Sequence, residues 1–365
     1  MSNQQSPIPW WRVQFAEADL NSVTQTIQAE HLSLGPVTAA FEEKLAALLE
    51  VPYVVASTSG SMAILMALIA IGIRAGDEVI IPNRTWIAAA HAAMMLGAKP
   101  VFVDVCENIP NINVALIEEK ITPHTKAIIP TTLNGRSVDI DNINAIAKKY
   151  NILVIEDAAQ ALFSRSHGKW MGTQTALGCF SLSMAKLIPT GQGGFVVTRE
   201  KELYQTLRKM RTHGVDDLLN CDFTQFGFNF RYTDLQASIG ISQLQRVDQK
   251  MKSMKRIYHQ YELGLKNCSS IQLIPVNLAC GELPLYVEVI CKNRNNLIDF
   301  LKKKNIQSKA FYPNLNRAAY FGCTSRFVNA DKFESQGLTL PCGPDQTIEN
   351  MDRVIDVLLE YDSYL

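Results

Sequence analysis

A carboxylate and an amine about thirty residues apart are the groups in this chain best suited to chemistry. Asp157 stands just after the apolar run 152–155, and Lys186 stands between a serine-rich stretch and the glycine turn 191–194. A buried acid and one reachable lysine suit an enzyme that uses pyridoxal phosphate, because the lysine forms a Schiff base and the acid keeps the pyridine nitrogen protonated. Either residue alone is more often a helix cap or a solvated surface group, but the pair indicates catalysis.

The turn at residues 57–61, Ser-Thr-Ser-Gly-Ser, is a candidate phosphate site. It follows an apolar run and opens a helical pattern, so free N–H groups and hydroxyls would face outward at a helix N-terminus. Gly60 would permit close approach of the backbone. A plain N-cap is the other interpretation, and both stay open at this point.

Apolar runs alternate with helical patterns from about residue 51 to residue 200. Runs without polar alternation indicate strands buried on both faces, and their alternation with helices predicts a mostly parallel sheet covered by helices on each side. Ligands bind such sheets beyond the carboxyl ends of the strands. The expected strands are residues 52–56, 78–81, 100–105, 127–129 and 152–155, and the expected helices are residues 62–71 and 87–96.

The pattern becomes more basic and less regular after residue 250, where a long amphipathic helix begins. A strand is expected at residues 285–290, and helices are expected at residues 296–303 and 351–361. We therefore expect a large domain at residues 1–250, which includes an N-terminal segment, and a small C-terminal α+β domain at residues 251–365.

Composition excludes several classes of protein. The 365 residues include 35 basic and 35 acidic side chains, so no net charge attracts nucleic acid or an anionic membrane. No apolar run is long enough to span a bilayer, and the first residues do not resemble a secretory signal. The eight cysteines are scattered without metal-ligand spacing, which predicts reduced thiols in a cytoplasmic protein and no metal site.

Short motifs follow one another in a fixed order along nearly the whole chain, most sparsely after residue 250. They are Leu34-Gly35-Pro36, Ser59-Gly60-Ser61, residues 76–82, Thr85-Trp86, residues 156–160, Phe180-Ser181, Lys186, Gly193-Gly194, residues 211–214 and residues 229–237. In this order they resemble the DegT/DnrJ/StrS family of pyridoxal-phosphate-dependent sugar aminotransferases. The resemblance implies a fold-type I, aspartate-aminotransferase-like α/β architecture and a homodimer with shared active sites.

The resemblance also implies a role for each candidate site residue. Lys186 would carry pyridoxal 5'-phosphate and later move a proton, and Asp157 would bind the pyridine nitrogen. Trp86 would stack on the ring face, and Gln160 would lie near the phenolic oxygen. The phosphate would be held by hydroxyl, backbone and amide groups of Ser59, Gly60, Ser61 and Ser181, and of Asn229 from the neighbouring subunit. His213 has no role that the residues require.

Transfer of an amino group, with L-glutamate as donor, to a keto-sugar is the implied reaction. The implied acceptor is a nucleotide-linked keto-hexose of surface-polysaccharide or lipopolysaccharide biosynthesis. Family members commonly carry a histidine within the segment 130–135 and a second one where this chain has Asn316, and Gln192 stands where glutamate is usual. These departures leave open a nucleotide-free acceptor, such as an oxidised 3-deoxy-octulosonate.

Three other classes of protein compete with this one. An amino-dehydratase would also keep Lys186 and stays open. A non-catalytic regulatory relative would be expected to lose Lys186 or Asp157, and both are present. A nicotinamide enzyme is not supported, because the glycine turn 191–194 lacks the G-x-G-x-x-G spacing and does not follow the first strand.

Overall fold

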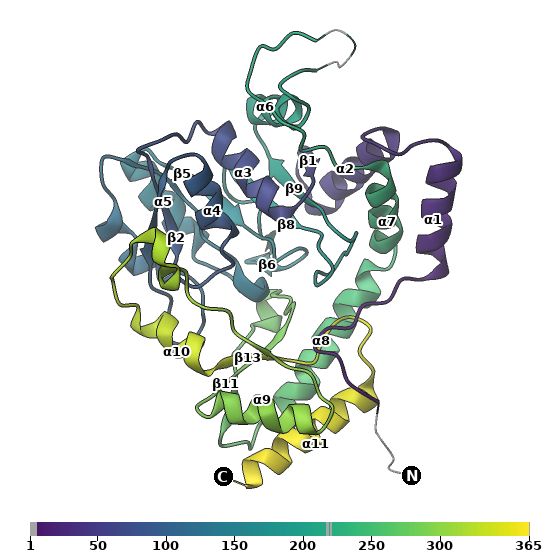
Figure 1. Ribbon diagram of the computed structural model, residues 1–365, viewed down its shortest axis with the longest axis vertical. Helices are drawn as coiled ribbons and strands as arrows, with labels where there is room; N and C mark the ends of the chain where they lie inside the picture. The colour runs from purple at the N-terminus through teal and green to yellow at the C-terminus, as the bar shows by residue number, and fades with distance from the viewer. Residues whose placement is uncertain (1–5, 217–218, 220, 365) are drawn as a thin grey trace.

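A seven-stranded sheet forms the centre of the molecule in the computed structural model, which describes residues 6–216, 219 and 221–364 (Figure 1). Its spatial order is β1-β9-β8-β5-β4-β2-β3, and only β9 runs antiparallel to its neighbours. The strands are β1 (Tyr53–Ser57), β2 (Glu78–Pro82), β3 (Lys99–Val103), β4 (Thr125–Ile128), β5 (Leu153–Asp157), β8 (Leu177–Ser181) and β9 (Gly194–Thr198). The expected mostly parallel sheet is confirmed.

Helices cover both faces of this sheet, which explains why its strands are apolar on both sides. One face packs against α3, α4 and α6, whereas Phe41 and Leu45 of α2 and Ile143 of α5 pack against the other. The helices of this part are α1 (Glu17–Gln28), α2 (Pro36–Leu49), α3 (Gly60–Ala70), α4 (Ala88–Met95), α5 (Ile140–Tyr150), α6 (Lys201–Arg211) and α7 (Asp234–Leu244).

A smaller antiparallel sheet, of order β10-β11-β13-β12, is built from the C-terminal part of the chain. Its strands are β10 (Ile271–Leu273), β11 (Val287–Cys291), β12 (Lys309–Ala310) and β13 (Gly337–Leu340). Its helices are α8 (Val247–Gly264), α9 (Arg294–Lys303), α10 (Val328–Gln336) and α11 (Ile348–Ser363). A two-stranded ribbon, β6 (Arg165–Ser166) and β7 (Lys169–Trp170), lies between β5 and β8 in the sequence.

The N-terminal segment packs against this C-terminal part. Ile8 bridges Ile306, and Trp11 bridges Cys342. One continuous helix, α8, carries the chain from the first sheet toward the second, and residue 250 lies inside it. The division at residues 250 and 251 stays a prediction. Within the described residues, no helix is long and apolar enough to cross a membrane.

Candidate active site

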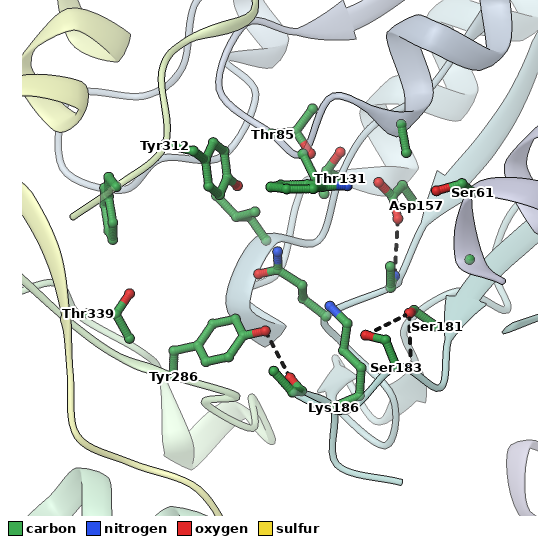
Figure 2. A pocket seen from close by; sticks show the side chains of 18 of the residues that line it. Ser61, Thr85, Thr131, Asp157, Ser181, Ser183, Lys186, Tyr286, Tyr312 and Thr339 are labelled. Atoms are coloured by element: carbon green, nitrogen blue, oxygen red, sulfur yellow. Dashed lines mark hydrogen bonds between the residues drawn. The ribbon is translucent and has the colours of Figure 1, made fainter. Parts of the chain in front are cut away.

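A cavity of about 380 Å³ opens at the carboxyl ends of β1, β5 and β8 (Figure 2). One side is formed by these strand ends and by the start of α3. The other side comes from the C-terminal part of the chain, which supplies residues 309–312 and Thr339. This is the edge of the sheet at which the sequence predicts a ligand site.

Lys186 projects into this cavity from the loop that follows β8. The backbone N–H of Lys186 donates to the Ser183 carbonyl oxygen at 3.1 Å. The carbonyl oxygen of the following residue, Leu187, accepts from Nζ of the buried Lys250 at 3.2 Å. Burial lowers the pKa of Lys186 to about 8, although the nearby Asp157 carboxylate acts in the opposite direction. The loop thus presents an amine that loses its proton close to neutral pH.

Asp157 ends β5 and points into the same cavity (Figure 2). Burial raises the pKa of this carboxyl, while the Ala159 N–H, which donates to Oδ1 at 3.1 Å, and the charge of Lys186 favour the ionised form. Parallel pairing of Asp157 with Cys179 on β8 holds the carboxyl beside the strand that leads to Lys186. The structure therefore brings together the acid and the amine that the sequence pairs.

The serine-rich turn and Ser181 meet at the edge of the cavity. Ser59 is the N-cap of α3, where its Oγ accepts from the Met62 N–H at 3.2 Å, and this capping role is compatible with a phosphate site at the same helix start. Gly60 lies against Ser181, since a Cβ on Gly60 would stand 2.8 Å from the Ser181 Cβ. Ser61 and Ser181 line the cavity on the same side (Figure 2). A helix N-terminus and three hydroxyls form an arrangement that suits an oxyanion.

Trp86 and Gln160 also line the cavity. The Trp86 ring is 54% exposed, and its edge-to-face contact with Tyr312 has a centroid separation of 5.6 Å. A tryptophan held in this way offers a free face for a flat ligand. Oε1 of Gln160 accepts from the Asn134 N–H at 3.0 Å, which fixes the amide.

Asn229 is the one predicted site residue that does not line the cavity. It is exposed, and its Oδ1 accepts from Nε of Arg231 at 3.0 Å. Asn229 follows a loop that projects from the large sheet and exposes Phe223, Phe226 and Phe228 (Figure 1). His213, which is also exposed, begins this loop in a left-handed conformation with φ of 57°.

Asn134 lies within the segment 130–135, in which the family commonly has a histidine, and Asn316 stands where the family commonly has a second one. Asn134 is buried, and its Nδ2 donates to the Tyr286 carbonyl and to Glu288, each at 3.0 Å. Asn316 and Asn83 exchange two hydrogen bonds of 3.0 Å and join the C-terminal part of the chain to the loop after β2. Both asparagines are thus engaged with protein groups.

Several residues that line the cavity were not predicted from the sequence. Arg84 stands two residues before Trp86 but belongs to no motif. Others come from segments after residue 280, where the motifs are sparsest, such as Tyr286, Glu288, Lys309 and Phe311. Among them Glu288 forms a buried ion pair with Arg136 at 2.6 Å.

The residues present fit pyridoxal phosphate. The cavity offers an amine, a buried carboxyl, an aromatic face and a hydroxyl-rich helix N-terminus, which correspond to the four chemical parts of that molecule. The Thr85 hydroxyl lines the cavity and has no hydrogen-bond partner among the described residues, as expected of a group that serves a ligand.

Glu156 precedes Asp157 on β5 and does not line the cavity, because successive strand residues point to opposite faces. Burial raises its pKa to about 7. Between its ordinary pKa of 4.5 and this value, the unfolded chain loses the proton and the folded chain keeps it, so this residue makes the protein less stable as pH rises.

Glu156→Gln is therefore expected to raise the free energy of unfolding at pH 8 by about 1–3 kcal/mol relative to the parent, because glutamine avoids ionisation of a buried acid. The difference between the two proteins should shrink toward pH 4.5. Urea unfolding at both pH values measures it. A difference that does not depend on pH would contradict the assignment of this carboxyl as a buried, titrating group.

Comparison with known proteins identifies the class to which this site belongs. The family model described as "DegT/DnrJ/EryC1/StrS aminotransferase family" matches residues 13–359. The chain belongs to this family. The resemblance inferred from the short motifs is therefore confirmed.

Individual relatives agree with this assignment. GDP-perosamine synthase of Caulobacter vibrioides is 34% identical over 334 residues, which cover 89% of this chain and 90% of that protein. UDP-2-acetamido-2-deoxy-3-oxo-D-glucuronate aminotransferase of Pseudomonas aeruginosa is 33% identical and covers 85% of this chain and 87% of its own length. The crystal structure of S. venezuelae DesV with a ketimine intermediate superposes with a TM-score of 0.92 at 28% identity, over 98% of this chain and 99% of that chain.

Proposed function

We propose that this protein is a pyridoxal-phosphate-dependent aminotransferase that moves an amino group from L-glutamate to a keto-sugar, most simply a nucleotide-linked keto-hexose of polysaccharide biosynthesis. The observation that carries the proposal is the meeting of Lys186, Asp157 and the serine-lined start of α3 in one cavity. Membership of an aminotransferase family, with relatives whose names specify nucleotide-linked sugars, supports the reaction and the substrate class.

Each residue has a defined task in this proposal. The cofactor, when bound, supplies an electron-withdrawing ring that stabilises negative charge on the carbon beside the amine. Lys186 Nζ holds it covalently and, once released, takes and returns a proton, which suits its pKa of about 8. Asp157 keeps the ring nitrogen protonated, Trp86 covers the ring face, and Gln160 orients the phenolic side. Ser59, Gly60, Ser61 and Ser181 bind the phosphate.

A nucleotide-free acceptor, such as an oxidised 3-deoxy-octulosonate, is the second candidate. The observation in its favour is that the segment 130–135 holds no histidine and that Asn316, at the second family histidine position, is hydrogen-bonded to Asn83. Both acceptors use the same amino-transfer chemistry at Lys186. They differ only in what occupies the substrate end of the cavity.

An absorbance spectrum of the purified protein with pyridoxal phosphate, before and after glutamate, tests this function. The expected result is a visible band that glutamate converts to the pyridoxamine form and that one class of keto-sugar restores. Keto-sugars with and without a nucleotide distinguish the two candidate acceptors. Absence of any cofactor band would contradict an enzymatic role and would favour a non-catalytic relative.

The pH dependence of cofactor loading follows from the lowered pKa of Lys186. Only the uncharged amine attacks the aldehyde, so the loading rate of the apo-protein should rise about tenfold per unit from pH 6 and level off above pH 8. Stopped-flow absorbance between pH 6 and 9.5 measures this rate. A rate that still climbed toward pH 10.5, the ordinary lysine value, would show that the amine is not desolvated.

We also propose a homodimer with shared sites, in which Asn229 of one subunit reaches the cofactor phosphate bound to the other. Asn229 is exposed and lies outside its own cavity, and the loop before it exposes three phenylalanines, Phe223, Phe226 and Phe228. Exposed apolar side chains close together favour an interface. A cytoplasmic location is proposed as well, because buried cysteines such as Cys179 and Cys342 are free thiols.

Mixing two inactive variants tests the shared site. Lys186→Ala and Asn229→Ala homodimers should each be impaired, whereas a mixed dimer regains one site with both native residues, so an equal mixture should recover about a quarter of the parent activity. The measurement is turnover after co-refolding or co-expression. Activity no higher than the mean of the separate variants would mean that Asn229 serves its own subunit or none.

A further inference from the structure

Arg84 is a buried cation on the wall of the active-site cavity. Its side chain is 1% exposed, and its Nη1 donates to the Tyr312 carbonyl oxygen at 2.7 Å and to Asn314 Oδ1 at 3.3 Å. The guanidinium carbon lies 4.6 Å from the ring centroid of Phe311 and 4.7 Å from that of Tyr312. Backbone, amide and rings together fix the orientation of this side chain.

No acid forms an ion pair with Arg84 among the described residues, although the charges of Glu288 and Glu334 favour its charged form. None of the ion pairs formed there includes it, and its Nε is buried without a hydrogen-bond partner. The free energy cost of a buried, unpaired charge is high, so natural sites keep one where a ligand supplies the opposite charge. Nη1 is engaged and Nε is buried, so Nη2 is the nitrogen that remains to donate to an oxyanion in the cavity.

The other charges of the cavity are already committed. Besides Asp157, the buried acid of the cavity lining is Glu288, which is bound by Arg136 and Asn134. In the proposed function Asp157 binds the ring nitrogen of the cofactor, and Lys186 binds the cofactor's carbonyl carbon. Lys309 adds a second unpaired cation to the Phe311–Tyr312 wall, where its Nζ lies 4.9 Å from the Trp10 ring centroid. This wall therefore carries an excess of positive charge.

The cofactor phosphate does not account for this charge. The serines that would bind it, Ser61 and Ser181, lie on the opposite side of the cavity from Tyr312 (Figure 2). Arg84 is tied to the Tyr312 backbone and belongs to that second side. An anion on Arg84 would thus lie on the side of the cavity left for substrate.

We propose that Arg84, assisted by Lys309, binds an oxyanion of the substrate, a carboxylate or a phosphate, and so positions the substrate for Lys186. This assignment rests on the proposed aminotransferase function. The oxyanion has two possible sources, a carboxylate of the amino donor or an acidic group of the keto-sugar. A planar, hydrogen-bonded guanidinium suits either source, and its fixed orientation favours one binding mode.

Binding of unreactive anions tests the proposal without turnover. Holoenzyme is titrated calorimetrically with glutarate, a dicarboxylate, and with inorganic diphosphate. At least one should bind the parent, and Arg84→Gln should weaken that binding about 10- to 100-fold, the loss expected for charged hydrogen bonds. Arg84→Lys should weaken it less, because it keeps the charge but not the fork. Unchanged binding in Arg84→Gln, or no binding of either anion to the parent, overturns the proposal.

The two half-reactions identify the source of the oxyanion. Arg84→Gln should raise the half-saturating concentration of either glutamate or the keto-sugar, while the other reactant and the cofactor affinity stay within about threefold of the parent. Equal losses in both half-reactions together with weakened cofactor binding would show a purely structural role.

A second variant tests the assisting lysine. Because the Lys309 side chain is exposed, Lys309→Gln should leave the core intact and should cause a smaller change in the same half-reaction. Arg256→Gln, which removes an exposed arginine from α8, is the control. Failure of the parent to exchange amino groups would refute the proposed reaction alone.

Discussion

Lys186→Ala is expected to lower kcat by about 10⁴-fold or more, because one side chain both holds the cofactor and moves the proton. The lining of the cavity contains one other lysine, Lys309, which lies against Trp10 on the opposite wall. Turnover with glutamate and a keto-sugar measures the loss. Borohydride reduction followed by peptide mass analysis should attach the cofactor to the Lys186 peptide of the parent and to no peptide of the variant.

An exposed lysine supplies the control for this experiment. Lys302→Ala, at the end of α9, removes the same charge far from the cavity and should leave kcat within about twofold of the parent. Retention of a tenth or more of the parent activity in Lys186→Ala would refute the assigned role. Labelling of Lys309 in the parent would do the same.

Asp157→Asn is expected to reduce kcat by about 10³-fold, with cofactor still bound but more weakly. The amide is nearly the same size, so it preserves packing at the end of β5, yet it carries no charge to keep the ring nitrogen protonated. The loss should fall on both half-reactions equally, since each of them needs the same electron-withdrawing ring. Single-turnover absorbance measurements of each half-reaction provide the test.

Glu156→Gln is the matched control for Asp157→Asn. It makes the same chemical change on the neighbouring residue, whose side chain is also buried but does not line the cavity. Its catalytic rate should remain within about threefold of the parent at pH 7. If both amides lowered the rate to the same extent, the effect would belong to strand β5 as a whole and not to contact with the cofactor.

Local patterns predicted five of the seven strands of the large sheet, β1 to β5, and the helices α3 and α4, but missed β8 and β9. The buried runs at residues 78–81 and 152–155 became β2 and β5, because continuous Val and Ile residues need protein on both faces. The antiparallel strand β9 was not predicted, although residues 194–198 form an apolar run. A run of this length does not reveal strand direction, which depends on pairing with β1 and β8, distant in sequence.

The sequence predicted the cofactor end of the site more completely than its substrate end. Lys186, Asp157 and the serines stand in recognisable local contexts, a strand end or a helix start. Arg84 and Lys309 have no such context, and their importance depends on the lack of an ion-pair partner among the described residues, a property of tertiary packing alone. The role of Asn229 at the site of the neighbouring subunit stays a prediction, because the sequence and fold of one chain do not define the contacts between two subunits.

Strand β9 has a consequence for how this enzyme emerges from the ribosome. Gly194 of β9 pairs with Ser57 on one side and with Ser181 on the other, so it joins the two segments of the proposed phosphate site. Any side chain here would crowd the Gly60 backbone nitrogen, which would lie 2.5 Å from the added Cβ. A nascent chain that ends before residue 194 therefore has the serines but not the strand that aligns them. Cofactor capture during synthesis must wait until β9 has left the exit tunnel.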